Sequence, residues 1–521
     1  EVMRVHPKDN ETVNECWISD RDRFSYLGLS SEDRLAAPMV KRKGEWVEVD
    51  WAEALEETAK ALKAAQAESS ALVSPGATLE ELHLLKRLME GLGSNNIDFR
   101  LRQRDFRVPA PAFPWLGQAI ADLENVNAAL LIGSNVRKEQ PILGHRLRKA
   151  ALEDAQISFI NPYEIDLNYA ADQLVSTPAG MIDDLAAVAK ALGLSGGLID
   201  SATADESHQT IAQQLKDAEN ATVLLGNIAT AHPDYAILCG LAEKIAEAAN
   251  AKLGFLPEAA NSVGAHLLLN GANNNAEILN GTPKAVVLLG VEPGSDFWNP
   301  VQTQQALTKA DSVIALTTFR SACLEESATV MLPMAAFTET SGSYINAEGR
   351  WQSFSGVVKP VGEARPAWKI LRVLGNLLDI SDFDYDSSQE VLAEVQAQCS
   401  EKQPDNKMAA ALPTERNSDV DGVQRIGDVP LYAIDPLVRR SSALQQTHDA
   451  IKLGVYINPD EAQQAGFNEG DQVAVSQDGQ RATLTVFIDS NIPDGAVRIP
   501  AGVAGSAALA GQFGQVTLEK A

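Results

Sequence analysis

Short runs of continuous apolar residues recur along the chain, and each run ends at a glycine, an asparagine or another small polar residue. They lie at 69–76, 127–135, 221–227, 284–290 and 311–318. Most are followed by a stretch whose apolar residues repeat with the period of a helix. Continuous apolar runs, in place of alternation, are typical of strands buried on both faces of a parallel sheet. The pattern therefore predicts an α/β fold with doubly wound sheets in the middle of the chain.

Two helix starts support this prediction. Asp50 precedes Glu53 at the spacing of a capping box, in which the acid reaches back to the amide of the capping residue. Thr78 and Glu81 repeat the same spacing. Gly93 follows the second helical stretch and suits a C-terminal cap. These signals predict strand–helix units and carry no information about a ligand.

The last part of the chain has a different pattern. Residues 401–430 are polar and rich in turn formers, which predicts a linker or a long surface loop. Beyond them, alternating runs at 472–476 and 481–488 are separated by Asp-Gly and Glu-Gly-Asp turns. Alternation between tight turns predicts a small antiparallel barrel.

Composition and charge narrow the class of protein. The chain has 521 residues, 45% apolar and 22% charged, which is typical of a globular protein of about three or four domains. Its apolar runs are far shorter than the roughly 20 residues that cross a bilayer. The net charge of −27 would repel nucleic acid and anionic lipid. We therefore expect no nucleic-acid partner and no direct membrane insertion.

Cysteine usage argues against a local metal site. The four cysteines are far apart, and no two have CxxC spacing: Cys16, Cys239, Cys323 and Cys399. So few cysteines, without a signal peptide, favour a reducing cytosolic compartment. The chain begins at Glu1 with a strand-like sequence, from which we expect that the N-terminus of a longer protein is missing.

Two of the apolar runs end in similar polar turns. Gly133 and Asn135 follow one run, and Gly290 follows another. The carboxyl ends of parallel strands are where doubly wound sheets bind nucleotides, because backbone amides can approach a phosphate closely there. Neither turn matches GxGxxG, so a plain turn glycine is the simpler interpretation and nucleotide binding is the alternative.

Two groups of charged residues are interpreted as solvent-exposed parts of helices. A basic cluster in an acidic chain is interpreted as a solvated helix face, with a phosphate or a partner's carboxylates as the alternative: His145, Arg146, Arg148 and Lys149. The adjacent acids Glu80 and Glu81 are expected on an exposed helix start and are not predicted to be catalytic.

Residues 331–354, MLPMAAFTETSGSYINAEGRWQSF, join an apolar strand end to a dense polar stretch. Together with residues 358–378, this stretch resembles part of the cofactor-cleft wall in molybdopterin-dependent oxidoreductases. Within that superfamily it is most similar to the large iron–sulfur subunit of bacterial respiratory complex I, the NADH:quinone oxidoreductase. Residues 1–29, 130–143 and 457–475 also resemble parts of that subunit, so the resemblance covers essentially the whole chain.

The resemblance implies a molybdopterin-oxidoreductase-like fold, with two interleaved doubly wound α/β domains and a C-terminal β-barrel. The implied domains are a remnant of the N-terminal cluster-binding subdomain (1–48), a discontinuous α/β domain (49–120 and 284–400), a second Rossmann-like α/β domain (121–283), a linker (401–430) and a dinucleotide-binding-type β-barrel (431–521).

Two departures from the superfamily pattern affect the expected cofactors. Ser19 stands where members with an extra [4Fe–4S] cluster have a cysteine, and Cys16 lies three residues early. The loop at 100–120, which would supply a metal ligand in molybdenum enzymes, contains no Cys or Ser. Only Asp105 is available there, and neighbouring arginines favour an ion pair. We therefore expect no cofactor in this segment, and molybdopterin in particular is not expected.

The cleft itself is expected to persist as a vestige. Its predicted residues are Gly133, Asn135, Gly290, Glu339, Asn346, Glu348 and Arg350. Without a cofactor, the last four are expected to bond one another and stiffen the domain interface, because buried polar groups need partners. Retained binding of a pterin or another small molecule is the alternative.

The resemblance also implies a function. The full subunit would relay electrons from NADH toward quinone, using [2Fe–2S] and [4Fe–4S] clusters in the missing N-terminal part, while this segment acts mainly as a scaffold. Its partners would be other peripheral-arm subunits of complex I, at the cytoplasmic face of the bacterial inner membrane. The alternatives are a molybdopterin-dependent oxidoreductase in its own right and a nucleotide-binding module.

Overall fold

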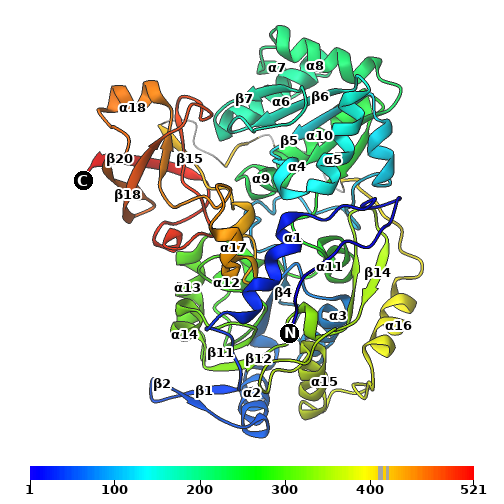
Figure 1. Ribbon diagram of the computed structural model, residues 1–521, viewed down its shortest axis with the longest axis vertical. Helices are drawn as coiled ribbons and strands as arrows, with labels where there is room; N and C mark the ends of the chain where they lie inside the picture. The colour runs from blue at the N-terminus through cyan, green and yellow to red at the C-terminus, as the bar shows by residue number, and fades with distance from the viewer. Residues whose placement is uncertain (409–412, 414, 418–421) are drawn as a thin grey trace.

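The computed structural model describes residues 1–408, 413, 415–417 and 422–521. Within this part of the chain there are two sheets covered by helices and a C-terminal barrel that lies beside them (Figure 1). The predicted α/β fold class with a barrel is therefore confirmed. No helix in these residues is long and apolar enough to cross a membrane.

The larger sheet combines distant parts of the chain. Its order is β2 (Glu45–Glu48), β1 (Met39–Arg42), β12 (Val330–Pro333), β11 (Ser312–Thr317), β10 (Ala285–Leu289), β3 (Ser69–Val73) and β4 (Ile97–Asp98). The strands from β12 to β4 are parallel, whereas β1 pairs antiparallel with both β12 and β2. Every residue of β3 and β10 is buried, which is why both read as continuous apolar runs.

The second sheet forms between β4 and β10 along the chain. Its order is β7 (Asp172–Val175), β6 (Gln156–Asn161), β5 (Ala128–Ile132), β8 (Ala221–Leu225) and β9 (Lys252–Phe255), and all neighbours are parallel. Each of the five predicted apolar runs contains a strand of one of the two sheets. The two sheets are therefore interleaved in sequence, as the resemblance implied.

The barrel closes in the order β15 (Val423–Ile426), β19 (Ala496–Arg498), β16 (Val455–Ile457), β18 (Gln480–Ile488), β17 (Gln472–Gln477) and β20 (Gly514–Lys520). The prediction of a purely antiparallel barrel is wrong, because β15 with β19 and β16 with β18 are parallel pairs. The connections between these partners are long enough to return the chain in the same direction. The predicted Asp-Gly turn is present, with positive φ at Asp478 (47°) and Gly479 (78°).

The predicted domain borders stay a prediction, but several placements bear on them. β1 and β2 lie within predicted domain 1–48 yet pair with the larger sheet. β15 begins inside the predicted linker 401–430. Residues 409–412, 414 and 418–421 of that linker lie outside the described residues.

Helices cover both sheets (Figure 1). They are α1 (Asp20–Phe24), α2 (Trp51–Ala65), α3 (Leu79–Gly91), α4 (Val136–Glu139), α5 (Pro141–Leu152), α6 (Pro178–Ala191), α7 (Leu198–Ser201), α8 (Glu206–Asp217), α9 (Asn227–Ala231), α10 (Tyr235–Ala248), α11 (Ser262–Leu269), α12 (Asn275–Asn280), α13 (Pro300–Lys309), α14 (Ala322–Ser327), α15 (Ala367–Leu377), α16 (Ser388–Cys399), α17 (Ser442–Gln445) and α18 (Pro459–Ala465). A hairpin of β13 (Gly342–Ile345) and β14 (Trp351–Phe354) stands apart from the sheets.

The predicted helix starts are confirmed, although only the second has both bonds of a capping box. Asp50 accepts a hydrogen bond from the Glu53 amide at the start of α2. Thr78 and Glu81 form a complete capping box on α3, and Gly93 follows that helix with a φ of 79°.

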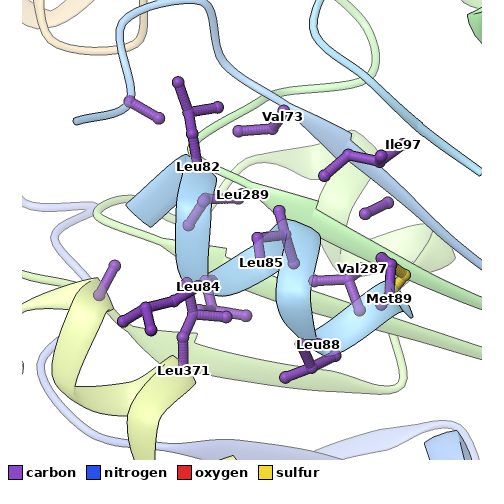
Figure 2. Close-up of a cluster of buried hydrophobic side chains, with 14 of the residues drawn as sticks. Val73, Leu82, Leu84, Leu85, Leu88, Met89, Ile97, Val287, Leu289 and Leu371 are labelled. Carbon is purple, nitrogen blue, oxygen red and sulfur yellow. The ribbon is translucent and has the colours of Figure 1, made fainter. Parts of the chain in front are cut away.

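Helix α3 lies at the centre of the largest core cluster (Figure 2). Leu82, Leu85 and Leu88 belong to the same cluster as Val287 and Leu289 of strand β10. Leu371 of α15 joins the cluster from the neighbouring helix (Figure 2). The position of α3 matters for function because its N-terminus points into the cleft described below.

Leu85→Ala should lower the free energy of unfolding by about 2–5 kcal/mol, because it leaves a cavity between α3 and its neighbours. The midpoint of urea denaturation, followed by circular dichroism, measures this loss. Leu152→Ala is the matched control, since the Leu152 side chain is 60% exposed, and it should cost less than about 0.5 kcal/mol. Equal losses in the two variants would contradict the packing described here.

Candidate functional site

The larger sheet has a topological switch point between β3 and β10. From β3 the chain continues to β4 on one side, whereas from β10 it continues to β11 and β12 on the other side. Crevices beyond the carboxyl ends of parallel strands at such points are the usual ligand sites of doubly wound sheets. A cavity of about 430 Å³ lies at this place, and Ser74, Gly76 and Gly290 line it.

Two segments from opposite ends of the chain cover this cleft. One is α1 with the 3₁₀ helix Ser25–Ser30, and the other comprises residues 434–445 (Figure 1, where α1 and α17 lie side by side). The Ser441 hydroxyl donates a hydrogen bond to the Phe24 carbonyl at 2.9 Å. Gly28 lies so close to Leu437 that a Cβ atom there would sit 2.4 Å from the Leu437 carbonyl oxygen. The cleft is therefore roofed by the chain itself.

A buried ion-pair network fixes this roof to the sheet. Arg439 contacts Glu292 at 2.8 Å and Asp296 at 2.9 Å. Arg440 contacts Glu292 at 2.7 Å and stacks over the Phe319 ring, 4.3 Å from its centroid. Burial disfavours the charged form of Arg439, but the charges of Asp296 and Glu292 outweigh it and raise its pKa.

Two more arginines near the cleft, Arg102 and Arg34, also form ion pairs with carboxylates of the chain. Arg102 pairs with Glu258 at 2.5 Å and with Asp296 at 3.1 Å. Arg34 pairs with Glu339 at 2.9 Å. All three pairs are largely buried, and they engage both guanidinium groups with carboxylates of the chain.

Most of these charged residues were not found from the sequence. Arg439, Arg440, Glu292 and Asp296 are absent from the predicted site. An Arg-Arg pair in an acidic chain was an available signal, but its carboxylate partners lie more than 140 positions away.

Three of the predicted site residues bond one another in the turn between β13 and β14. The Asn346 side-chain oxygen accepts from the Glu348 and Arg350 amides at 3.1 and 2.9 Å. Glu348 accepts from Arg350 Nε at 2.6 Å and from the Ile120 amide at 2.8 Å. The last bond ties the hairpin to the segment that leads into the second sheet.

The other predicted residues are dispersed. Glu339 pairs with Arg34 and is not bonded to the turn. Gly290 has a φ of 67° and lines the cavity. Gly133 and Asn135 follow β5 in the second sheet, where a Cβ on Gly133 would meet the Ala229 amide at 2.4 Å. The structure thus does not bring the seven residues into one site, and a ligand role for any of them stays a prediction.

Asp105 has the predicted ion pair. It contacts Arg107 at 2.8 Å and accepts a hydrogen bond from the Ala236 amide at 2.9 Å. Arg107 also contacts Asp234 at 2.8 Å. Ser19, at the position of a possible cluster ligand, caps α1 by accepting from the Asp22 amide.

The interpretation of the basic cluster as a solvated helix face is wrong. Arg146 is buried and contacts Glu15 at 2.9 Å, and it also pairs with Glu124. Lys149 contacts Glu15 at 2.7 Å, and this hydrogen bond lowers the pKa of Glu15 to about 2. Residues 11–15 of the same chain cover the basic cluster. They lie about 130 positions away in the sequence, so the local pattern does not reveal this contact.

The expectation of an exposed acidic helix start is also wrong. Glu80 and Glu81 are 1% and 4% exposed, because the β13–β14 hairpin covers the start of α3. Glu80 accepts a hydrogen bond from the Ser343 amide at 2.9 Å. Burial nevertheless dominates and raises the pKa of Glu80 to about 7.

Comparison with known proteins identifies the fold's family. Residues 34–377 match the molybdopterin oxidoreductase family. The chain belongs to this family. Residues 438–520 match its dinucleotide-binding domain. Residues 1–27 match the 4Fe-4S domain of the NADH-ubiquinone oxidoreductase NDSU1/NuoG-like type.

Curated relatives agree with this assignment. The chain is 30% identical over 413 residues to the G subunit of the NADH-quinone oxidoreductase from Rickettsia felis, covering 75% of this chain and 54% of the relative. The corresponding protein of Rickettsia typhi is 28% identical over 412 residues, with the same coverage. The chain thus spans about half the length of the curated relatives it matches.

The solved structure of acetylene hydratase from Pelobacter acetylenicus has the same fold. It matches with a TM-score of 0.67 and 14% identity, over 100% of this chain and 96% of that one. At this identity the likeness concerns the fold alone.

The lining of this cavity offers few cations for the phosphate group of a pterin cofactor. The charged residues that line the cavity are five acids and two arginines: Asp22, Glu81, Glu258, Asp296, Asp435, Arg21 and Arg102. Phosphate groups require cations or free backbone amides. Arg102 is already held by two carboxylates, so this arginine is not free to bind a phosphate group.

Glu80→Gln should flatten the pH dependence of stability. A folded-state pKa near 7, above the usual 4.5, means that the fold favours the protonated acid. This stabilisation is complete below about pH 4.5 and is lost as pH rises through 7, on the order of 2 kcal/mol. Urea midpoints at about pH 5 and pH 8 measure it. Glu90→Gln, on the exposed face of the same helix, should leave the pH dependence of stability unchanged. An unchanged pH dependence in Glu80→Gln would contradict the raised pKa of Glu80.

Arg439→Met should lower the free energy of unfolding by about 3–5 kcal/mol, because it breaks two buried ion pairs, one with Glu292 and one with Asp296. Thermal and urea unfolding of the purified chain measure the loss. Arg481→Met is the control, since the ion pair of Arg481 with Glu519 is exposed and should contribute less than about 1 kcal/mol. A loss no greater than that of the control would show that the network is not stabilising.

Proposed function

We propose that this chain is part of the large iron–sulfur subunit of an NADH–quinone oxidoreductase and serves there mainly as a scaffold. One observation carries the proposal: a segment of NDSU1/NuoG-like 4Fe-4S type precedes a molybdopterin oxidoreductase region in the same chain. The names of the curated relatives support it. The whole protein would relay electrons from NADH toward quinone.

The scaffold role is supported by how the cleft residues are used. Arg102 in the cavity lining, and Arg34, Arg439 and Arg440 near it, bind carboxylates of this chain. Glu348 joins the hairpin to the segment before the second sheet. We propose that the [2Fe–2S] and [4Fe–4S] clusters lie in another part of the protein and that this segment holds no molybdopterin.

The proposed partners and location follow from the same relatives. We propose that the chain contacts other peripheral-arm subunits, on the cytoplasmic face of a bacterial inner membrane. The competing proposal, favoured by the family match itself, is an independent molybdopterin oxidoreductase in which Asp105 would have to leave Arg107 to bind the metal.

The test uses the whole protein in its native host. With Arg439→Met, NADH–quinone activity of the membranes should fall in proportion to the amount of assembled complex, while the turnover of each assembled complex stays unchanged. Arg481→Met serves as the control. Molybdenum and tungsten, measured by mass spectrometry, should be near zero per chain. One atom per chain, or normal NADH–quinone activity after deletion of the gene, would overturn the proposal.

A further inference from the structure

The cavity at the switch point has the dimensions of a small-molecule site. Its volume of about 430 Å³ falls in the range of roughly 300–1,000 Å³ that is typical of ligand pockets. It lies where a doubly wound sheet ordinarily binds ligands. The cavity therefore has the size and the position of a binding site. The residues that line it determine which ligand it can bind.

Aromatic and aliphatic side chains form much of the lining. Four aromatic rings line the cavity: Phe319, Phe337, Tyr344 and Phe354. Tyr344 and Phe354 are stacked, with ring centroids 5.1 Å apart, and Phe337 remains 40% exposed. A ligand that covers such rings gains about 25 cal/mol per Å² of apolar surface removed from water.

The cavity offers little to an anion, because the two arginines in its lining already contact carboxylates of the chain. Arg102 is held by Glu258 and Asp296, and Arg21 lies 3.5 Å from Asp22. Turning Arg102 to an anionic ligand would break two buried ion pairs, which is costly.

Existing contacts hold the cavity open. The Thr78–Glu81 capping box fixes the end of α3, and the Ser74 hydroxyl accepts from the Gly76 amide at 3.2 Å. Arg440 stacks over Phe319 on the opposite wall. A preformed cavity lowers the entropic cost of binding.

We propose that this cavity binds an uncharged, largely apolar small molecule with an aromatic ring system. The ring stacks among Phe337, Tyr344 and Phe354, and the hydroxyl groups of Ser74 and Thr318 border the cavity for one or two hydrogen bonds. This binding site goes beyond the proposed scaffold role and does not depend on the electron-transfer partners. Its ligand differs in charge and polarity from a phosphorylated pterin.

Titration of the purified 521-residue chain with Nile red, an uncharged aromatic dye, tests the proposal. Binding should saturate near one dye per chain, with blue-shifted emission. Thr318→Trp fills the cavity and should weaken binding at least tenfold, whereas Thr308→Trp, on the exposed surface of α13, should leave it unchanged. Guanosine 5′-monophosphate, a purine with a phosphate, should not displace the dye.

A second variant guards against a folding defect in Thr318→Trp. Phe337→Ala shortens one exposed wall residue and should weaken binding about threefold or more, with an unchanged circular dichroism spectrum. Dye binding that does not saturate, that survives both cavity variants, or that is displaced by guanosine 5′-monophosphate would overturn the proposal. Dye binding is measured independently of electron-transfer activity. The ligand-site proposal can therefore be overturned while the proposed scaffold role stands, and the reverse also holds.

Discussion

The buried pairing of Arg439 and Arg440 with Glu292 and Asp296 is the interaction on which the arrangement of the cleft depends. Removing guanidinium and carboxylate groups from water is costly, and only close, multiple contacts offset that cost. Because of this, the network tolerates few geometries. It fixes residues 434–445, which lie between barrel strands β15 and β16, over the carboxyl ends of the larger sheet. The roof of the cleft is therefore set by electrostatics as much as by apolar packing.

The same network changes the chemistry of the cleft without changing its place. The crevice at the switch point between β3 and β10 is retained, as the family fold requires. Its cations, however, are neutralised by carboxylates of the chain, and the lining is acidic and aromatic. The crevice thus combines buried ion pairs with apolar surface.

Several features of the fold could be predicted from local sequence. The strands β3, β5, β8, β10 and β11 were predictable because a strand buried on both faces must be apolar at nearly every position. The capping box of α3 was predictable because its partners lie three residues apart. The direction of the barrel strands was not, because β15 and β19 are separated by about seventy residues and alternation alone does not distinguish parallel from antiparallel pairing.

Burial of charged residues was decided by tertiary structure alone. Glu80 and Glu81 resemble an exposed helix start until the β13–β14 hairpin, more than 260 residues away, covers them. Arg146 is buried by the N-terminal segment, and the predicted cleft residues follow strands of two different sheets or lie in and near the separate β13–β14 hairpin. The sequence by itself determined the buried strands and the helix ends, since these depend on residues within a few positions of one another, and its resemblance over longer segments indicated the family. Which charges are paired, and hence what the cleft can bind, depended on contacts between distant segments that form only when the chain folds.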